Sequence, residues 1–226
     1  MLSQMTRDGV APPRVSAKSE LRAHIRSARR ALPAAVRAAA DRALVAAAVG
    51  VVRASGATSV AAYVPMLSEP GGPQLVSALA EAAPRLLLPV LLDDLDLDWA
   101  LHDGGFAAGR YGLIEPTGPR LGVDAVAAVG LVLLPALAVS RDGVRLGQGG
   151  GSYDRVLPRV TAPTVAPLYP GELVGSVPAE PHDRRICGAL VGNDPDGYEE
   201  PHLHWTKGCA VAHHWHSEQS SANNGG

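Results

Sequence analysis

Apolar runs that leave no polar face are the feature that most constrains the fold of this chain. Clear examples are RLLLPV at 85–90 and LVLLP at 131–135. A strand that is apolar on both faces needs helices on both sides of its sheet, as in parallel α/β sheets. Further strands are expected at 58–64, 97–101 and 164–168. We therefore predict a single-domain, layered α/β fold with a mostly parallel central sheet flanked by helices.

A basic stripe marks the first predicted helix, which begins near Ser16. Apolar residues recur there at helical spacing, while Lys18, Arg22, Arg26 and Arg29 fall on another face. Such a stripe is more typical of a solvated helix face than of a binding site. Further helices are expected over 33–53, 73–82 and 152–160.

Length and composition indicate one core with two tails. The 226 residues, 46% of them hydrophobic, are enough for one substantial domain. Residues 1–15 are polar and lack a period, so we expect a flexible arm. The catalytic α/β domain should cover 16–192. Residues 193–226 change to a composition rich in histidine and polar residues, and we expect a flexible tail rather than a zinc site, because the spacing of structural zinc ligands is absent.

Charge and hydropathy exclude several classes of partner. A formal net charge of −2 and 4% aromatic residues argue against nucleic acid, which requires basic or stacking surfaces. The longest apolar run, 43–52, is about half of a membrane crossing. Two cysteines do not make a disulfide framework, and the first residues lack an apolar signal core. We expect a cytoplasmic monomer that acts on small molecules without contacting membranes.

A glycine-rich loop, RLGQGGGSYDR at 145–155, carries the clearest chemical signal. Glycine leaves backbone N–H groups unshielded, so consecutive amides can converge on a phosphate, and a following helix adds partial positive charge. Asp154 could hold a cation that bridges such phosphates. The alternative is purely structural, because Asp142-Gly143 resembles a hairpin turn and the glycines could serve only chain reversal.

Known phosphate loops fit this sequence only in part. A P-loop needs Gly-Lys-Ser/Thr, and Gly150-Gly151-Ser152 has no lysine. Gly147 and Gly149 match the start of a dinucleotide fingerprint, but its third small position is Ser152, and Val174 and Gly175 rather than an acid stand where a ribose ligand is expected. A Rossmann dehydrogenase therefore remains a weak alternative.

Acidic residues occur in the three segments that follow predicted strands. They are Glu69, Asp154 and Asp183. Ligands of open α/β sheets gather at the carboxyl ends of strands, although a single loop acid is more often simply solvated.

Taken together, these segments resemble the 5-formyltetrahydrofolate cyclo-ligase family. The resemblance runs through KSELR at 18–22, AAYVPMLSEP at 61–70, GRYGLIEP at 109–116, the glycine-rich loop, and VPAEPHDRRI at 177–186. It implies ATP- and magnesium-dependent cyclisation of 5-formyltetrahydrofolate to 5,10-methenyltetrahydrofolate, with release of ADP and phosphate. Phosphorylation makes the N5-formyl oxygen a good leaving group, so that N10 of the substrate can attack the formyl carbon. The substrates implied are a reduced folate and ATP.

The resemblance also assigns roles to individual residues. ATP contacts are implied for Lys18, Arg22, Arg145, Gly147, Gln148, Gly149, Gly150, Gly151, Ser152, Tyr153 and Asp154. Of these, Arg145, Tyr153 and Asp154 are the implied catalytic residues. Asp154 and Asp183 would bind Mg²⁺, since one or two carboxylates usually hold that ion beside phosphates. Folate contacts are implied for Val64, Met66, Glu69 and Tyr111, the last of which could equally be a core aromatic.

Three positions depart from the family pattern. Ser152-Tyr153 replaces a pair of tyrosines, Gln148 replaces a more usual aromatic or basic residue, and Pro70 follows Glu69. A catalytically impaired regulator of the same fold, which binds folate or nucleotide without turnover, is therefore the alternative function.

Overall fold

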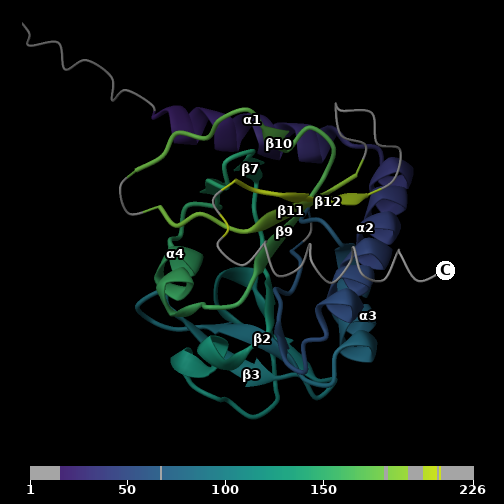
Figure 1. The fold of residues 1–226 in the computed structure, drawn as a ribbon, viewed down its shortest axis with the longest axis vertical. Coiled ribbons are helices and arrows are strands. Elements are labelled where there is room, and N and C mark those ends of the chain that lie inside the picture. The colour runs from purple at the N-terminus through teal and green to yellow at the C-terminus, as the bar shows by residue number, and fades with distance from the viewer. Residues whose placement is uncertain (1–15, 67, 181–182, 193–200, 208, 210–226) are drawn as a thin grey trace, which may run out of the picture.

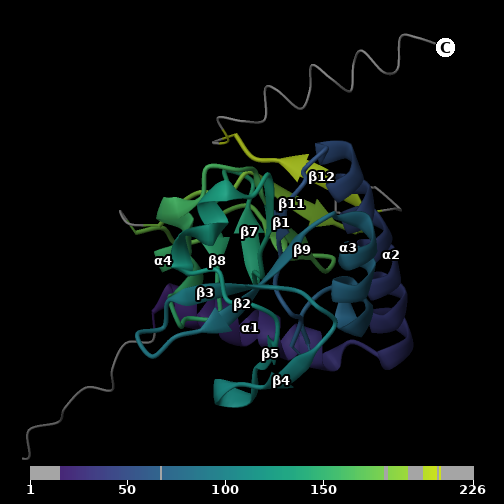
Figure 2. The same cartoon turned by 90° about the horizontal axis from the view of Figure 1, so that it is seen from below.

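A seven-stranded, mostly parallel sheet forms the centre of the protein (Figures 1 and 2). The computed structural model describes residues 16–66, 68–180, 183–192, 201–207 and 209. In spatial order the strands are β12 (His202–Trp205), β11 (Gly188–Val191), β9 (Thr164–Leu168), β6 (Leu131–Leu133), β1 (Val60–Ala61), β2 (Leu86–Leu91) and β3 (Leu97–Leu101). The five inner strands run parallel and the two edge strands antiparallel. The predicted α/β fold is confirmed.

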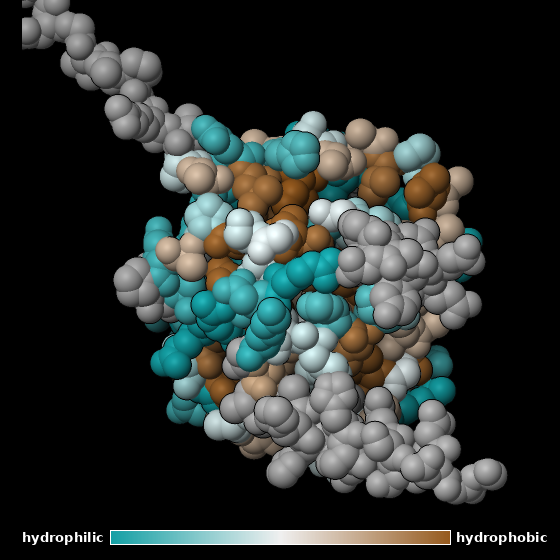
Figure 3. Space-filling view, turned by 45° about the horizontal axis from the view of Figure 1, so that its top comes forward, coloured by the Kyte–Doolittle hydropathy of each residue, from teal (hydrophilic) through white to brown (hydrophobic). Residues whose placement is uncertain are grey.

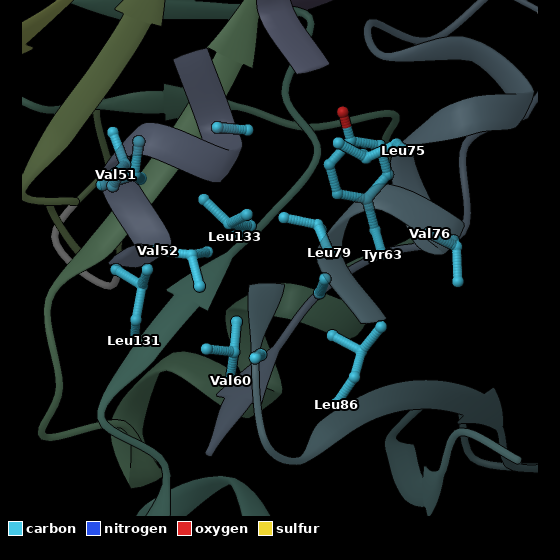
Figure 4. Packing of buried hydrophobic residues seen from close by; sticks show 14 of the residues in the cluster. Val51, Val52, Val60, Tyr63, Leu75, Val76, Leu79, Leu86, Leu131 and Leu133 are labelled. Carbon is cyan, nitrogen blue, oxygen red and sulfur yellow. The ribbon is translucent and has the colours of Figure 1, made fainter. Parts of the chain in front are cut away.

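Each face of the sheet is buried under helices, as the apolar runs require. On one face, α2 (Ala34–Ser55) and α3 (Leu75–Ala82) pack against Leu131 and Leu133, as Figure 4 shows. Val132, between these two leucines, points into the opposite core. That core lies under α4 (Ser152–Val156) and two short 3₁₀ segments, η3 (Val123–Ala128) and η4 (Leu157–Arg159). A further 3₁₀ segment, η1 (Gly72–Gln74), directly precedes α3 and contacts α2.

The first helix packs on a separate, smaller sheet. α1 (Ala17–Ala31) begins after Ser16, whose side chain accepts a hydrogen bond from the Ser19 N–H. It lies beside β10 (Leu173–Val174), β7 (Ala138–Ser140) and β8 (Arg145–Leu146), and its Ile25 belongs to their apolar cluster (Figure 1). The turn joining β7 to β8 contains Gly143 with φ of +94°. The hairpin expected at Asp142-Gly143 is thus present, and it leads directly into the glycine-rich loop.

The C-terminal part of the sheet contains elements that the sequence did not reveal. β11 was not predicted, and β12 lies within the segment expected to be a tail, pairing with β11 from Gly188 opposite Trp205 to Val191 opposite His202. A disulfide joins Cys187 and Cys209, whose Cα atoms are 4.6 Å apart. The expected arm at 1–15 and most of the expected tail lie outside the described residues. His213, His214 and His216 are among the latter.

Strand order places a topological switch point between β1 and β6. From β1 the chain crosses through α3 to β2 on one side, whereas β6 pairs with β1 on its other side and is followed by β9 and β11. Loops that leave two such strands diverge and open a crevice at their carboxyl ends. The loops that follow β1 and β6 are therefore where a ligand site is expected.

The outer surface is mainly polar on the face drawn in Figure 3. Hydrophilic residues form a band across the middle of this face, and hydrophobic residues reach it in smaller areas. Within the described parts of the chain, none of the helices combines the length and the apolar character needed to cross a membrane.

Candidate functional site

A cavity of about 430 Å³ lies at the switch point. Its walls come from α1, the loop after β1, the strands β2 and β3, the hairpin of β4 (Phe106–Ala108) and β5 (Ile114–Pro116), the glycine-rich loop, and the segment before β11. The volume falls within the usual range for small-molecule sites. The predicted site residues that line it are Lys18, Arg22, Val64, Met66, Glu69, Arg145, Gly147, Gln148, Gly149, Gly150, Gly151, Ser152, Tyr153, Asp154 and Asp183.

The glycine-rich loop has a backbone that requires glycine. Gly149 has φ of +107° and Gly151 has φ of +75°, values at which a residue with a Cβ is strained. A Cβ at Gly147 would lie 2.7 Å from Nη1 of Arg145. The chain reversal is already made by the β7–β8 turn at Gly143, which precedes this loop.

The basic stripe of α1 faces the protein. Nε of Arg22 donates to the carbonyl of Gly147 at 3.0 Å, and Arg26 donates to both oxygens of Gln148. Arg29, only 1% exposed, forms an ion pair with Glu172 at 2.7 Å. Interpreting the stripe as a solvated face was therefore wrong, because it docks α1 on the loops that form the cavity.

Each predicted magnesium ligand is paired with a predicted ATP contact. Nη2 of Arg145 lies 2.7 Å from Oδ1 of Asp154, and Nζ of Lys18 lies 2.8 Å from Oδ2 of Asp183. Nζ of Lys18 also lies 3.5 Å from Glu180. The carboxylates of Asp154 and Asp183 line the same cavity. Proteins usually bind Mg²⁺ through one or two carboxylates, with phosphates and water as the remaining ligands. No cluster of three or more metal-binding side chains occurs among the described residues, and this mode of binding does not need one.

Arg145 and Tyr153 both line the cavity and form a cation–π pair. The guanidinium carbon of Arg145 lies 5.6 Å from the centre of the Tyr153 ring, and Nη1 donates to the Pro135 carbonyl at 3.1 Å. The Tyr153 hydroxyl is buried without a hydrogen-bond partner within the described structure. Burial, together with the nearby charge of Glu69, raises its pKa. The hydroxyl therefore stays protonated and can donate a hydrogen bond to a ligand.

The loop after β1 presents Glu69 to the same cavity. Glu69 is 7% exposed, and its Oε2 accepts a hydrogen bond from the Met66 N–H at 3.0 Å. The hydroxyl of Tyr63 donates to the Pro70 carbonyl at 2.5 Å and holds the next turn of the loop. The loop thus keeps a nearly buried carboxylate oriented toward the cavity beside Val64 and Met66.

Tyr111 is the one predicted site residue that does not line the cavity. It is 78% exposed, has φ of +54° and lies in η2 (Arg110–Gly112), between β4 and β5. It is therefore not a core aromatic, and its contact with folate stays a prediction. Leu113 and Ile114 of the same hairpin do line the cavity. Their signal in the sequence is a pair of adjacent apolar residues directly after the turn residues of GRYGLIEP.

Buried polar residues support the site from behind, and sequence reasoning missed them. Asp41 of α2 accepts hydrogen bonds from the Gly71 N–H at 2.9 Å and from the Tyr169 hydroxyl at 2.7 Å. Arg29 donates to both carboxylate oxygens of Glu172 and to the carbonyl of Ala136. These contacts tie α1 and α2 to the loops after β1, β6 and β9.

Comparisons with known proteins cover most of the chain. A model of the 5-formyltetrahydrofolate cyclo-ligase family matches residues 14–192. The 5-formyltetrahydrofolate cyclo-ligase of Mycolicibacterium smegmatis is 42% identical over 182 residues, which cover 77% of this chain and 93% of that protein. The mouse protein of the same name is 32% identical over 71 residues, or 29% of this chain and 35% of the relative.

Two solved structures share the fold. The 5,10-methenyltetrahydrofolate synthetase of Aquifex aeolicus aligns with a TM-score of 0.68 at 23% identity, covering 78% of this chain and 90% of that one. The synthetase of Mycoplasma pneumoniae aligns with a TM-score of 0.60 at 20% identity, covering 76% and 96% respectively. At these identities the two likenesses concern the architecture alone.

Proposed function

Because the chain belongs to the 5-formyltetrahydrofolate cyclo-ligase family, we propose that it cyclises 5-formyltetrahydrofolate to 5,10-methenyltetrahydrofolate in a reaction that needs ATP and Mg²⁺. The family membership confirms the resemblance found in the sequence, and the protein is accordingly an enzyme of the cyclo-ligase type. The dependence on ATP and Mg²⁺ and the roles of individual residues belong to the proposal.

One observation carries the proposal: the glycine-rich loop and the loop with Glu69 line a single cavity. Phosphoryl transfer between two substrates requires both to be bound within reach of one another. In our proposal, the glycine-rich loop with Lys18 and Arg22 binds the phosphates of ATP, and Glu69 orients the pterin by accepting hydrogen bonds from its N–H groups. Leu113 and Ile114 would cover the apolar part of the folate.

The reaction proceeds in two bond exchanges. The N5-formyl oxygen attacks the γ-phosphorus of ATP, and the bond from that phosphorus to the bridging oxygen breaks to release ADP. N10 then attacks the formyl carbon and loses its proton, and the carbon–oxygen bond to the phosphoryl group breaks to release phosphate. The protein mainly supplies position and compensation of charge, as is usual in phosphoryl transfer.

In this proposal Arg145 and Tyr153 assist the transfer. The Arg145 guanidinium stabilises negative charge that develops on the transferring phosphoryl group, and the Tyr153 hydroxyl donates a hydrogen bond to a substrate oxygen. Asp154 and Asp183 would hold Mg²⁺, which would neutralise negative charge on the phosphates. In the structure the same two carboxylates pair with Arg145 and Lys18.

The function is tested by mixing purified protein with 5-formyltetrahydrofolate, ATP and Mg²⁺ and following methenyl absorbance. We expect product only when all three are present, with one ADP released for each methenyl group. Tight folate binding without ATP turnover would instead support the impaired regulator.

Lys18→Ala is expected to raise the KM for ATP about tenfold, the loss typical of one charge-assisted hydrogen bond. The KM for folate should change much less, because Glu69 and its loop are untouched. Initial rates at varied ATP measure the effect, and Arg30→Ala, at an exposed position of the same helix, is the control. An unchanged KM for ATP would show that Lys18 serves only to hold Asp183.

Glu69→Gln is expected to raise the KM for 5-formyltetrahydrofolate about tenfold, because a carboxylate that accepts two hydrogen bonds becomes an amide with one acceptor. The KM for ATP should stay close to that of the native enzyme. Rates at varied folate measure the effect, and Glu81→Gln, exposed on α3, is the control. Equal folate KM values for the native and Glu69→Gln enzymes would remove Glu69 from the folate site.

Three further expectations stay predictions. They are the division of the chain at residues 15/16 and 192/193, the monomeric state and the cytoplasmic location. The Cys187–Cys209 disulfide does not favour the last of these, because disulfides are more typical of oxidising compartments.

A further inference from the structure

Gln148 connects the two halves of the cavity through its side chain. Its Oε1 accepts hydrogen bonds from Nε of Arg26 at 3.1 Å and from Nη2 at 2.9 Å, and its main-chain carbonyl accepts from the same Nη2 at 2.7 Å. On the other side, Nε2 of Gln148 donates to Oε1 of Glu69 at 3.4 Å. A residue of the phosphate loop thus contacts the proposed pterin-binding acid.

The neighbours determine both the orientation and the identity of this side chain. A guanidinium only donates hydrogen bonds, and an ionised carboxylate only accepts them. The group between them must therefore accept on one side and donate on the other. A lysine or arginine at position 148 would place a second positive charge beside Arg26. A glutamate there would place a second negative charge beside Glu69. A primary amide satisfies both neighbours.

Glu69 depends on Gln148 for its second oxygen. Its Oε2 accepts the Met66 N–H, whereas within the described structure its Oε1 accepts a hydrogen bond from Nε2 of Gln148. The carboxylate is nearly buried, at 7% exposed, so that little water is available to replace the amide. Its position in the cavity is therefore sensitive to residue 148.

We propose that Gln148 is a positioning residue for folate: it holds the Glu69 carboxylate in the orientation that binds the pterin and links it through Arg26 to α1. This inference rests on the proposed function, in which Glu69 binds the pterin. It differs from an ATP-binding role for the Gln148 side chain, which turns toward Glu69, while the loop backbone remains available to phosphates.

The central test is Gln148→Glu, which keeps the size of the side chain and its acceptor for Arg26 but turns a second carboxylate toward Glu69. We expect a rise of about tenfold in the folate KM and in the dissociation constant for 5-formyltetrahydrofolate, with the KM for ATP changed less than about twofold. Calorimetric binding without ATP separates affinity from turnover. Gln148→Met, which removes the three side-chain hydrogen bonds without adding charge, should show a smaller rise of about threefold.

A double-mutant cycle distinguishes positioning from a general disturbance of the loop. In the Glu69→Gln background, Gln148→Glu restores an amide–carboxylate pair with the roles exchanged, and we expect it to change folate affinity less than about twofold. Equal effects in the two backgrounds, equal effects of Gln148→Glu and Gln148→Met, or a change confined to the KM for ATP would each overturn the inference while the cyclo-ligase function stands. Failure of the native protein to bind 5-formyltetrahydrofolate would overturn both.

Discussion

Asp154→Asn is expected to lower kcat/KM by at least about a hundredfold, the loss typical of a group that stabilises charge at the reacting centre. The substitution keeps the size of the side chain but removes the charge that faces Arg145 at 2.7 Å and that would hold Mg²⁺. The Mg²⁺ concentration needed for half-maximal rate should rise in parallel. Initial rates measured over a range of Mg²⁺ concentrations report both effects.

The fold should not change, because the Asp154 side chain is 45% exposed and its partner Arg145 keeps its hydrogen bond to the Pro135 carbonyl. Asp124→Asn is the matched control, since the Asp124 side chain is 86% exposed and does not line the cavity. Native kinetics in Asp154→Asn would exclude Asp154 from the reaction and leave the metal site to be sought elsewhere.

Arg29→Met is expected to destabilise the protein by about 3–5 kcal/mol, the usual cost of leaving one member of a buried ion pair without its partner. Arg29 is 1% exposed and donates to both oxygens of Glu172. Burial lowers the pKa of the guanidinium, but the hydrogen bond and charge of Glu172 outweigh it, so that the pKa is raised and the group stays charged. Equilibrium unfolding in urea measures the loss.

The loss in Arg29→Met should depend on pH. Burial already raises the pKa of Glu172, and Arg29 opposes that rise. Without Arg29 the folded-state pKa lies further above the unfolded value, so that the protonated folded form is favoured at low pH and its advantage is lost as pH rises through the folded pKa. The deficit in stability relative to the native protein should therefore shrink at mildly acidic pH.

Arg30→Met is the control, because Arg30 is exposed and follows Arg29 in α1, and it should lower the free energy of unfolding by no more than about 0.5 kcal/mol. A deficit independent of pH would point to lost packing rather than to an unpaired carboxylate.

The sequence predicted those elements whose signal is local. The strands β2, β3 and β9 were expected within a residue of their observed bounds. Their residues are mainly apolar, and turn residues flank them in the sequence. β1 was expected over 58–64 but extends only over Val60–Ala61, since the residues after it leave the sheet to form the cavity. β12 was not predicted, because the alternation in His202–Trp205 covers only four residues, and the segment becomes a strand by pairing with β11.

The candidate site was predictable where a residue type itself suggests chemistry. The glycines of the loop, the acids Glu69, Asp154 and Asp183, and Lys18 fall into that class, and all of them line the cavity. The supporting residues were not predictable. Glu172 is separated from Arg29 by 143 positions, and Asp41 stands in an alanine-rich helix whose sequence gives no hint of a polar partner. Their roles depend on which loops meet in space.

The neighbouring positions of β1 and β6 have a consequence for how the enzyme could diversify. Adjacent strands lie about 4.8 Å apart, and the pairing of Val60 with Leu131 fixes their relative height. The loop that would carry the phosphoryl acceptor and the one that follows β6 toward the donor thus leave a common rigid frame. Changes of sequence at the tip of either loop could therefore adjust the affinity for one reactant while the main-chain hydrogen bonds between β1 and β6 stay the same.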